Sequence, residues 1–400
     1  GGSGDVYTAY VRNIYDGFAE KEAEGKVSVY MPTVEFYKEY VKEESKKIPT
    51  RAQIEKIWDK VNAMDFCKEK DDIIYDTFAS MHVREAAVPD ELINIAAENA
   101  DVAVITLSRF SAEGVDRKPI DSDYYLSFEE KSLINRASKA FKKTIVVLNS
   151  GAVVDCEHFA DNDKVQGILF GWQGGLEGGA AVADILCGDV CPSGKLADTI
   201  PVSYYSYQNA EEFLTGFEHL DYYDDIYRYF ETIPGAAERV RYPFGFGLSY
   251  TDFELSGVLC GETDGKIVVS VNVKNIGSVP GKETVQLYYS APKGVLGKPA
   301  KELAAFAKTH LLNPGESETL ALSFDIADMA SFDDLGKVKK AAYVLEPGKY
   351  SFYLGNSVRS AEKIDYEYTV EDDVVVRQAS GLLRPFKLGK RMVADGSFEP

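Results

Sequence analysis

The sequence predicts an α/β half, with a mostly parallel sheet sandwiched by helices, followed by an all-β sandwich. Two observations support this prediction. In residues 6–210, short continuous apolar segments alternate with amphipathic segments of helical period, which is typical of strands buried on both faces of a parallel sheet. From about residue 250, apolar residues recur at every second position, as in half-buried strands. The length of 400 residues, 45% of them apolar, is enough for two or three domains with sizeable cores.

The α/β half is predicted to begin with a helix that ends near Gly25, because the apolar residues at 11, 14, 15 and 18 share one helical face. Residues 33–70 are charged and rich in helix formers, so we expect a helical insertion over one edge of the sheet, anchored by Ile57 and Trp58. Strands are expected at residues 102–107, 144–148 and 167–170, with helices at 127–141, which a capping box opens, and at 174–186.

The all-β half has the size of an immunoglobulin-like or fibronectin type III-like sandwich. Turn signals rich in Asn, Pro and Gly separate its strands, which we expect at residues 267–273, 284–289, 320–324 and 350–354. Residues 371–400 begin acidic and show no strand alternation, which predicts a linker tail. The expected domains are an α/β domain at 1–215, a linker at 216–249, the all-β domain at 250–370 and the tail at 371–400.

The net charge of −20, from 44 basic and 64 acidic residues, argues against nucleic-acid and membrane-surface partners, because both are anionic. It favours a neutral small molecule. No apolar segment approaches the roughly 20 residues that cross a bilayer. Five irregularly spaced cysteines fit reduced thiols in a cytoplasmic protein, although Cys187 and Cys191 leave a clipped loop or a metal open. No other feature implies a metal or cofactor.

The loop after the first predicted strand holds the candidate catalytic group. Ligands of parallel α/β sheets bind beyond the carboxyl ends of the strands, and Glu113 lies in such a loop beside Gly114. A carboxyl group there can serve as a general acid and base. The competing interpretation is a solvated ion pair of Glu113 with Arg109 or Arg117, which charged loops commonly form.

A glycine-rich segment, residues 171–179, follows the third predicted strand. Such a segment would suit a phosphate at a helix N-terminus, but it lacks the P-loop and dinucleotide-binding spacings. We favour the interpretation that its glycines let a helix pack closely on the sheet. The missing fingerprint also argues against a nucleotide-dependent oxidoreductase, and no Ser-His-Asp arrangement accompanies His158.

Five motifs along the chain resemble those of the glycoside hydrolase family three β-glucosidases. They are residues 111–119 (SAEGVDRKP), 146–151 (VVLNSG), 172–179 (WQGGLEGG), 192–196 (PSGKL) and 242–250 (YPFGFGLSY). Residues 2–5 (GSGD) also resemble the glycine/serine loop on the substrate side of that family. The similarity continues to about residue 370, and by it the all-β half is similar to the family's fibronectin type III-like domain.

The resemblance implies a retaining, exo-acting β-glucosidase in which Glu113 is the acid/base and Ser3 touches the sugar. Nearby side chains would hold the loop, namely Arg109, Arg117 and Lys118, with Asp116 as a structural partner. The family's barrel carries the aspartate nucleophile, and neither its Ser-Asp-Trp context nor its Lys-His motif occurs in this sequence. We therefore expect an incomplete enzyme, whose barrel follows in the same polypeptide in a permuted order or arrives as a second chain. The missing initiator Met agrees with a piece of a longer protein.

The expected substrates are small β-glucosides or cello-oligosaccharides, cleaved at terminal non-reducing β-D-glucosyl residues. A β-xylosidase is the nearest alternative, because most sugar selectivity would come from the missing barrel. The other alternative is a non-catalytic carbohydrate-binding or scaffold protein built from the same domains. A homo-oligomer is also compatible with the sequence.

Overall fold

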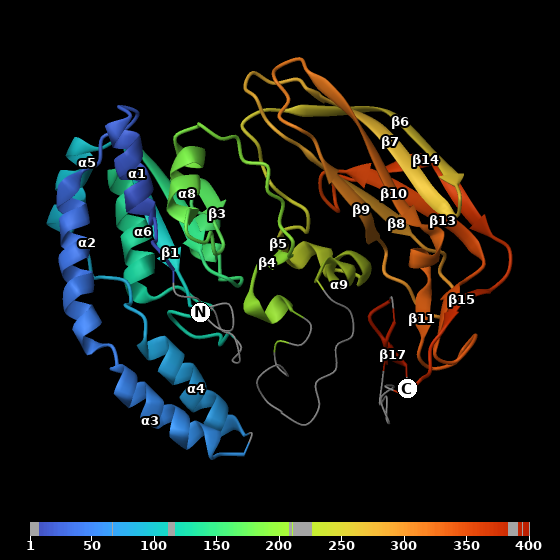
Figure 1. Ribbon diagram of the computed structural model, residues 1–400, viewed down its shortest axis with the longest axis horizontal. Coiled ribbons are helices and arrows are strands. Elements are labelled where there is room, and N and C mark those ends of the chain that lie inside the picture. The colour runs from blue at the N-terminus through green and yellow to red at the C-terminus, as the bar shows by residue number, and fades with distance from the viewer. Residues whose placement is uncertain are drawn as a thin grey trace. The chain divides into compact units, whose positions relative to one another are not determined.

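A three-stranded parallel sheet forms the centre of the first of two units (Figure 1). The computed structural model describes residues 8–65, 67–110, 117–207, 210, 226–382, 391–393 and 395–399. The first unit comprises Gly1–Asp189 and Val202–Leu220, and the second comprises Val190–Pro201 and Asp221–Pro400. The α/β half followed by an all-β half is confirmed.

The sheet contains β1 (Val102–Ser108), β2 (Lys143–Asn149) and β3 (Val165–Phe170), paired in parallel in that order. These are the three predicted strands. The central strand is buried on both faces, since neither Val146 nor Val147 has any exposed surface. Continuous apolar sequence therefore indicated the parallel sheet correctly.

The helices near the sheet begin and end close to the predicted positions. Helix α6 starts with the expected capping box, in which Ser127 and Glu130 satisfy each other's backbone N–H groups, and it packs on β1 and β2. Helix α8 begins at Gly178, later than the predicted residue 174, because Gly175 takes a left-handed turn conformation with φ +67°. The bounds are α1 (Ile14–Ala23), α5 (Asp90–Asn99), α6 (Phe128–Ala140), α7 (Glu157–Ala160) and α8 (Gly178–Leu186).

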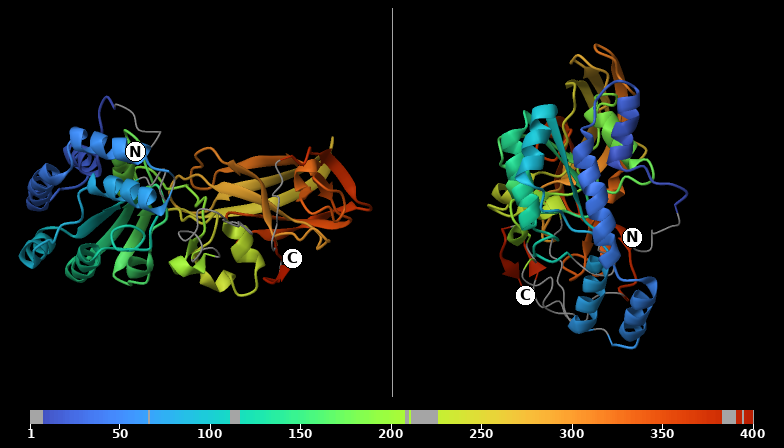
Figure 2. Two further views of the ribbon diagram at one scale, coloured as in Figure 1. Left: turned by 90° about the horizontal axis from the view of Figure 1, so that it is seen from below. Right: turned by 90° about the vertical axis from the view of Figure 1, so that its left-hand side faces the viewer.

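Residues 33–70 are helical, as predicted, and the helices continue to residue 80, ten residues past the predicted end. They are α2 (Met31–Glu44), η2 (Ser45–Lys47), α3 (Arg51–Asn62) and α4 (Lys68–Ser80). Figures 1 and 2 show these helices in succession along one side of the first unit. Helix α2 packs on α5. Trp58 joins α3 to α4 through an edge contact with Phe78, at 5.7 Å between ring centroids, so it anchors the insertion internally.

The second unit is an antiparallel sandwich. One sheet has the order β10-β7-β6, a second has the order β14-β13-β8-β9, and a small third sheet has the order β11-β12-β15. The strands are β6 (Phe253–Thr263), β7 (Lys266–Asn275), β8 (Thr284–Ser290), β9 (Glu302–Lys308), β10 (Ser317–Asp325), β11 (Ser331–Asp333), β12 (Ala342–Leu345), β13 (Gly348–Gly355), β14 (Glu362–Val370) and β15 (Val374–Gln378).

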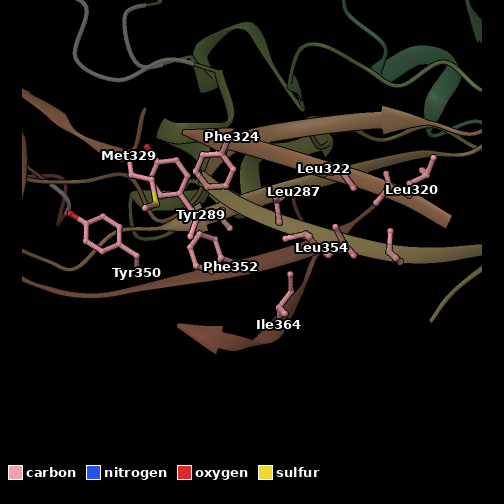
Figure 3. Packing of buried hydrophobic residues seen from close by; sticks show 14 of the residues in the cluster. Leu287, Tyr289, Leu320, Leu322, Phe324, Met329, Tyr350, Phe352, Leu354 and Ile364 are labelled. Carbon is pink, nitrogen blue, oxygen red and sulfur yellow. The ribbon is translucent and has the colours of Figure 1, made fainter. Parts of the chain in front are cut away.

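Alternate residues of the two larger sheets build the sandwich core. Leu287 and Tyr289 of β8 lie among Phe324 of β10 and Phe352 of β13, with Leu322 and Leu354 farther along (Figure 3). The opposite face of β8 is also buried, because Tyr288 packs under Tyr227 of α9 (Ile226–Thr232) and close to Phe244. A strand covered on both faces explains why Leu287, Tyr288 and Tyr289 of β8 are buried in succession.

The predicted linker tail, residues 371–400, departs from the prediction because it contains three strands: β15, β16 (Arg391–Met392) and β17 (Phe398–Glu399). Val374–Gln378 forms β15, antiparallel to β12, where the sequence predicts a linker tail without strands. Its residues are mostly exposed, so backbone pairing and not a buried face sets its position, and period-2 alternation could not reveal it.

The remaining elements are short. They are β4 (Ile200–Pro201), η3 (Tyr204–Ser206), η4 (Ala237–Arg239), β5 (Val240–Tyr242), η5 (Ile326–Met329), β16 (Arg391–Met392) and β17 (Phe398–Glu399). Strands β4 and β5 pair. The motif at residues 192–196 meets that at 242–250, since the Leu196 N–H donates to the Phe246 carbonyl and the Gly245 N–H donates to the Leu196 carbonyl. None of the helices that the structure describes is long and apolar enough to cross a membrane.

Candidate functional site

The two predicted site residues, Glu113 and Ser3, lie outside the described residues. The described part of the candidate site consists of the residues at the two ends of the loop that carries Glu113. Phe110 precedes this loop just beyond β1, and Arg117 follows it. Both ends lie in a dense network of charged and aromatic groups.

Arg109 fastens the chain directly after β1. Its guanidinium pairs with both carboxylate oxygens of Glu130, with Nη1···Oε1 2.6 Å and Nη2···Oε2 2.9 Å. Its other N–H groups donate to the carbonyls of Ser108, Asp123 and Tyr125, at 2.9, 2.7 and 3.4 Å. All five donors of an arginine are thus used, and the pair is buried, with 4% and 7% of the two side chains exposed.

Arg117 and Lys118 fasten the other end. Arg117 Nη1 pairs with Asp123 Oδ1 at 2.5 Å, and Nη2 donates to the carbonyl of Phe110. The Lys118 backbone N–H donates to Asp123 Oδ2 at 2.6 Å, and its ammonium pairs with Asp72 of α4 at 2.5 Å. The bond from Arg117 to Phe110 joins the two ends of the loop directly.

Asp123 is the centre of this network and is only 1% exposed. Besides Arg117 and Lys118, its carboxylate accepts a hydrogen bond from the hydroxyl of Tyr75 in α4, with Oη···Oδ2 2.7 Å. Burial, together with this bond to a carboxylate, raises the pKa of Tyr75, so the phenol remains a donor at neutral pH. Three donors converge on one buried acceptor from two separate places in the sequence, Tyr75 of α4 and the consecutive residues Arg117 and Lys118.

Aromatic rings enclose Phe110. Its ring packs against Tyr75 and Phe78 of α4, at centroid distances of 5.7 and 6.4 Å, and against His82 at 5.3 Å. The Arg117 guanidinium lies 5.1 Å from the centroid of the same ring. The insertion thus contributes a helix to the base of the loop.

These contacts bear on the ion-pair interpretation of Glu113. Arg109 has no N–H left for that carboxylate, because each of its donors already has an acceptor. Arg117 keeps one buried donor, Nε, that has no partner among the described residues. The ion pair with Arg117 stays an open prediction, and so does the catalytic role.

The glycine-rich segment serves close packing, as favoured: Gly171 lies against the Leu148 carbonyl of the sheet, and the tightest contact is between two helices. A Cβ on Gly179 would overlap the Asn13 carbonyl, and one on Gly17 would overlap the carbonyl of Gly179, so α1 and α8 touch through their backbones. The Gly179 N–H donates to Arg12 O at 3.1 Å. This donor at the start of α8 is therefore not available to a phosphate.

The open question of a metal at Cys187 and Cys191 can be judged from the part of the chain that the structure describes. Cys187 and Cys191 are both free thiols, and across the described ranges no three His, Cys, Asp or Glu side chains are grouped to hold an ion. His158 contacts the carbonyl of Lys131 at 3.1 Å, which is a structural contact within the first unit.

Comparison with known proteins assigns the chain to a family. Residues 1–250 match the model of the glycosyl hydrolase family 3 C-terminal domain, and residues 283–358 match that of the fibronectin type III-like domain. The chain belongs to glycosyl hydrolase family 3. The resemblance that the motifs suggested is confirmed.

Proteins named beta-glucosidase match most or all of this chain. Beta-glucosidase A of Butyrivibrio fibrisolvens is 42% identical over all of this chain and 49% of its own length, and a beta-glucosidase of Ruminococcus albus is 40% identical over 77% and 32%. The crystal structure of a beta-glucosidase from Paenibacillus barengoltzii superposes with a TM-score of 0.84 at 33% identity, over all of this chain and 42% of that one. The chain thus spans half or less of the length of these relatives.

Sequence reasoning alone did not find the residues that hold the family 3 loop together. Glu130 was visible only as a helix cap, and Tyr75 and Asp123 carried no signal, because 48 positions separate them in the sequence. The cations Arg109, Arg117 and Lys118 were identified as supports of the loop, but their carboxylate partners were not.

Proposed function

We propose that the chain is part of a retaining, exo-acting β-glucosidase in which Glu113 is the general acid and base. An aspartate attacks the anomeric carbon while Glu113 protonates the departing glycosidic oxygen, so that the C–O bond breaks and a glycosyl-enzyme forms. Glu113 then removes a proton from water, the water oxygen displaces the aspartate, and the sugar leaves with retained configuration.

The observation that carries this proposal is the network of buried contacts that fixes both ends of the loop beyond β1. Phe110 and Arg117, on either side of Glu113, are fixed by buried groups at the carboxyl end of a parallel strand, where sheets of this class bind ligands. The full use of Arg109 by other acceptors also supports a carboxyl group at position 113 that is not bound to this arginine. The names of the relatives give the sugar, a β-glucoside.

The nucleophile belongs to a barrel domain outside this chain, in the same polypeptide or in a second one. The relatives leave half or more of their length for such a domain. Cello-oligosaccharides are the proposed natural substrates, which would place the enzyme late in cellulose breakdown. We propose a cytoplasmic location, in keeping with the free thiols of Cys67, Cys187, Cys191 and Cys260.

Leaving-group chemistry tests the role of Glu113 in the intact enzyme. Glu113→Ala should lower kcat/KM for an alkyl β-glucoside by about 10²- to 10⁴-fold, because its leaving oxygen must be protonated. The loss for 2,4-dinitrophenyl β-glucoside should be much smaller, because that phenolate leaves without help. Added azide should restore turnover and yield the β-glycosyl azide.

Glu91→Ala, which removes an exposed carboxylate of α5, is the matched control and should leave both substrates unaffected. Equal losses on both substrates without azide rescue would reject Glu113 as the acid/base. Faster turnover of the matching xyloside would identify a β-xylosidase. Firm glucose binding by this chain alone would favour the non-catalytic alternative.

A further inference from the structure

We infer that Asp123 and Tyr75 are positioning residues of the acid/base loop and that the helical insertion aims Glu113 through them. This inference rests on the proposed role of Glu113. It concerns residues that do not belong to the motif of the loop itself. Tyr75 comes from α4, and Asp123 comes from the segment that leads into α6.

The loop is closed at its base by groups that all depend on Asp123. Arg117 is held by Asp123 Oδ1 and from there donates to the carbonyl of Phe110, so the first and last fixed positions of the loop are tied together. Asp123 Oδ2 holds the backbone N–H of Lys118, which fixes the direction in which the chain leaves the loop. Phe110 and Arg117, the described residues on either side of the loop, are therefore held together by a direct bond.

Helix α4 holds Asp123 in turn. The Tyr75 hydroxyl donates a hydrogen bond to Asp123 Oδ2. The Tyr75 ring also packs against Phe110, and its centroid lies 4.3 Å from Nζ of Lys118. Asp72, one turn earlier on α4, pairs with the same ammonium. One face of α4 therefore contacts both ends of the loop.

Removing the Tyr75 hydroxyl leaves the ring contacts in place and takes one donor from Asp123. Asp123 then keeps Arg117 and the Lys118 N–H but loses its donor from α4, so the carboxylate and the Arg117 guanidinium paired with it can shift together. A misplacement of about 1 Å at a proton-transfer group costs about 100-fold in rate. Such a shift affects only steps in which Glu113 transfers a proton.

The test uses the intact enzyme with the variants Tyr75→Phe and Asp123→Asn. Both should lower kcat/KM for an alkyl β-glucoside by about 10- to 100-fold and for 2,4-dinitrophenyl β-glucoside by less than about threefold. Tyr37→Phe is the matched control, because it removes the same kind of bond, from Tyr37 to the carboxylate of Glu85 at 2.8 Å, elsewhere in the insertion. It should leave the ratio of the two substrates unchanged.

Thermal unfolding of each variant separates misfolding from misplacement, since a loss of folded enzyme lowers both substrates equally. If Asp123→Asn does not fold, Tyr75→Phe decides the question alone. Equal losses on the two substrates, or a substrate ratio like that of Tyr37→Phe, would overturn the inference. When Glu113→Ala behaves as proposed and Tyr75→Phe does not, only the positioning role fails; when Glu113→Ala shows no leaving-group dependence, the proposed function fails first.

Discussion

Replacing Arg109 by methionine should destabilise the first unit by about 3–5 kcal/mol, the usual cost of removing one partner from a buried ion pair. The guanidinium supplies two bonds to Glu130 and three to backbone carbonyls. Without it, the buried carboxylate keeps the Ser127 backbone N–H at 2.8 Å as a donor. One neutral hydrogen bond does not offset the loss of hydration of a charge.

A double-mutant cycle sharpens the expectation. In Arg109→Met with Glu130→Met no buried charge remains, so the double variant should lose only about 1–3 kcal/mol, from the carbonyls and the helix cap left without partners. The coupling between the two positions should then be about 2 kcal/mol or more. Hydrogen exchange of the α6 backbone amides in the intact enzyme measures these differences, because a chain of several domains does not unfold in one step.

The matched control is Arg136→Met. Arg136 also belongs to α6 and also pairs with a carboxylate, that of Asp90 at 2.6 Å, but the Asp90 side chain is 77% exposed. Its loss should cost about 1 kcal/mol or less. A cost under about 1 kcal/mol for Arg109→Met, or additive effects of the two methionines, would refute the reasoning.

Three further variants test other parts of the fold. Asp333→Ala should destabilise the all-β unit by about 3 kcal/mol in urea unfolding, because the buried carboxylate accepts four backbone N–H bonds from residues 336–339. Burial raises the pKa of Asp333, but the four backbone hydrogen bonds lower it by more, so its pKa in the folded unit lies below the ordinary value. The carboxylate therefore contributes fully to the stability of the unit above the unfolded pKa of about 3.9, and this contribution is lost as pH falls through the lower folded pKa. Loss of this stability already near pH 6 would contradict the expectation. Gly179→Ala should lower the melting temperature by separating α1 from α8, whereas Gly178→Ala, with open space around its Cβ position, should not. Phe352→Ala should cost about 3–5 kcal/mol in the sandwich core, and an unchanged denaturant midpoint would exclude that core position.

Local patterns in the sequence predicted most of the fold. Continuous apolar segments marked the three parallel strands, and Ser127 with Glu130 marked the start of α6, because each signal lies within a few residues and depends on burial or capping. The strands of the predicted tail were missed: β15 because its exposed residues leave no alternation to detect, and β16 and β17 because two residues are too few to show a period. Backbone pairing alone carries no side-chain signature.

The candidate site was predicted only in part, since its contacts are long-range. Chemistry and strand order suggested Glu113, which lies outside the described residues and stays a prediction, and charge indicated the three nearby cations. The partners of those cations come from α4 and from the segment before α6, and nothing in the local sequence says that a tyrosine will donate to an aspartate 48 positions away. The glycines of residues 171–179 showed the need for close approach but not which element approaches.

The segment Val190–Pro201 has a consequence for dividing this protein into modules. It lies between parts of the α/β unit in sequence, yet Ile200 pairs with Tyr242 of β5, and Lys195 forms a buried pair with Glu283 at 2.9 Å. A gene fragment that starts at residue 250 would lack Lys195, the partner of Glu283, and also Tyr227 and Phe244, which cover Tyr288 on the outer face of β8. The all-β unit should therefore be produced as residues 190–201 joined to residues 221–400 through a short artificial connection. Domain exchange between relatives should move these two segments together.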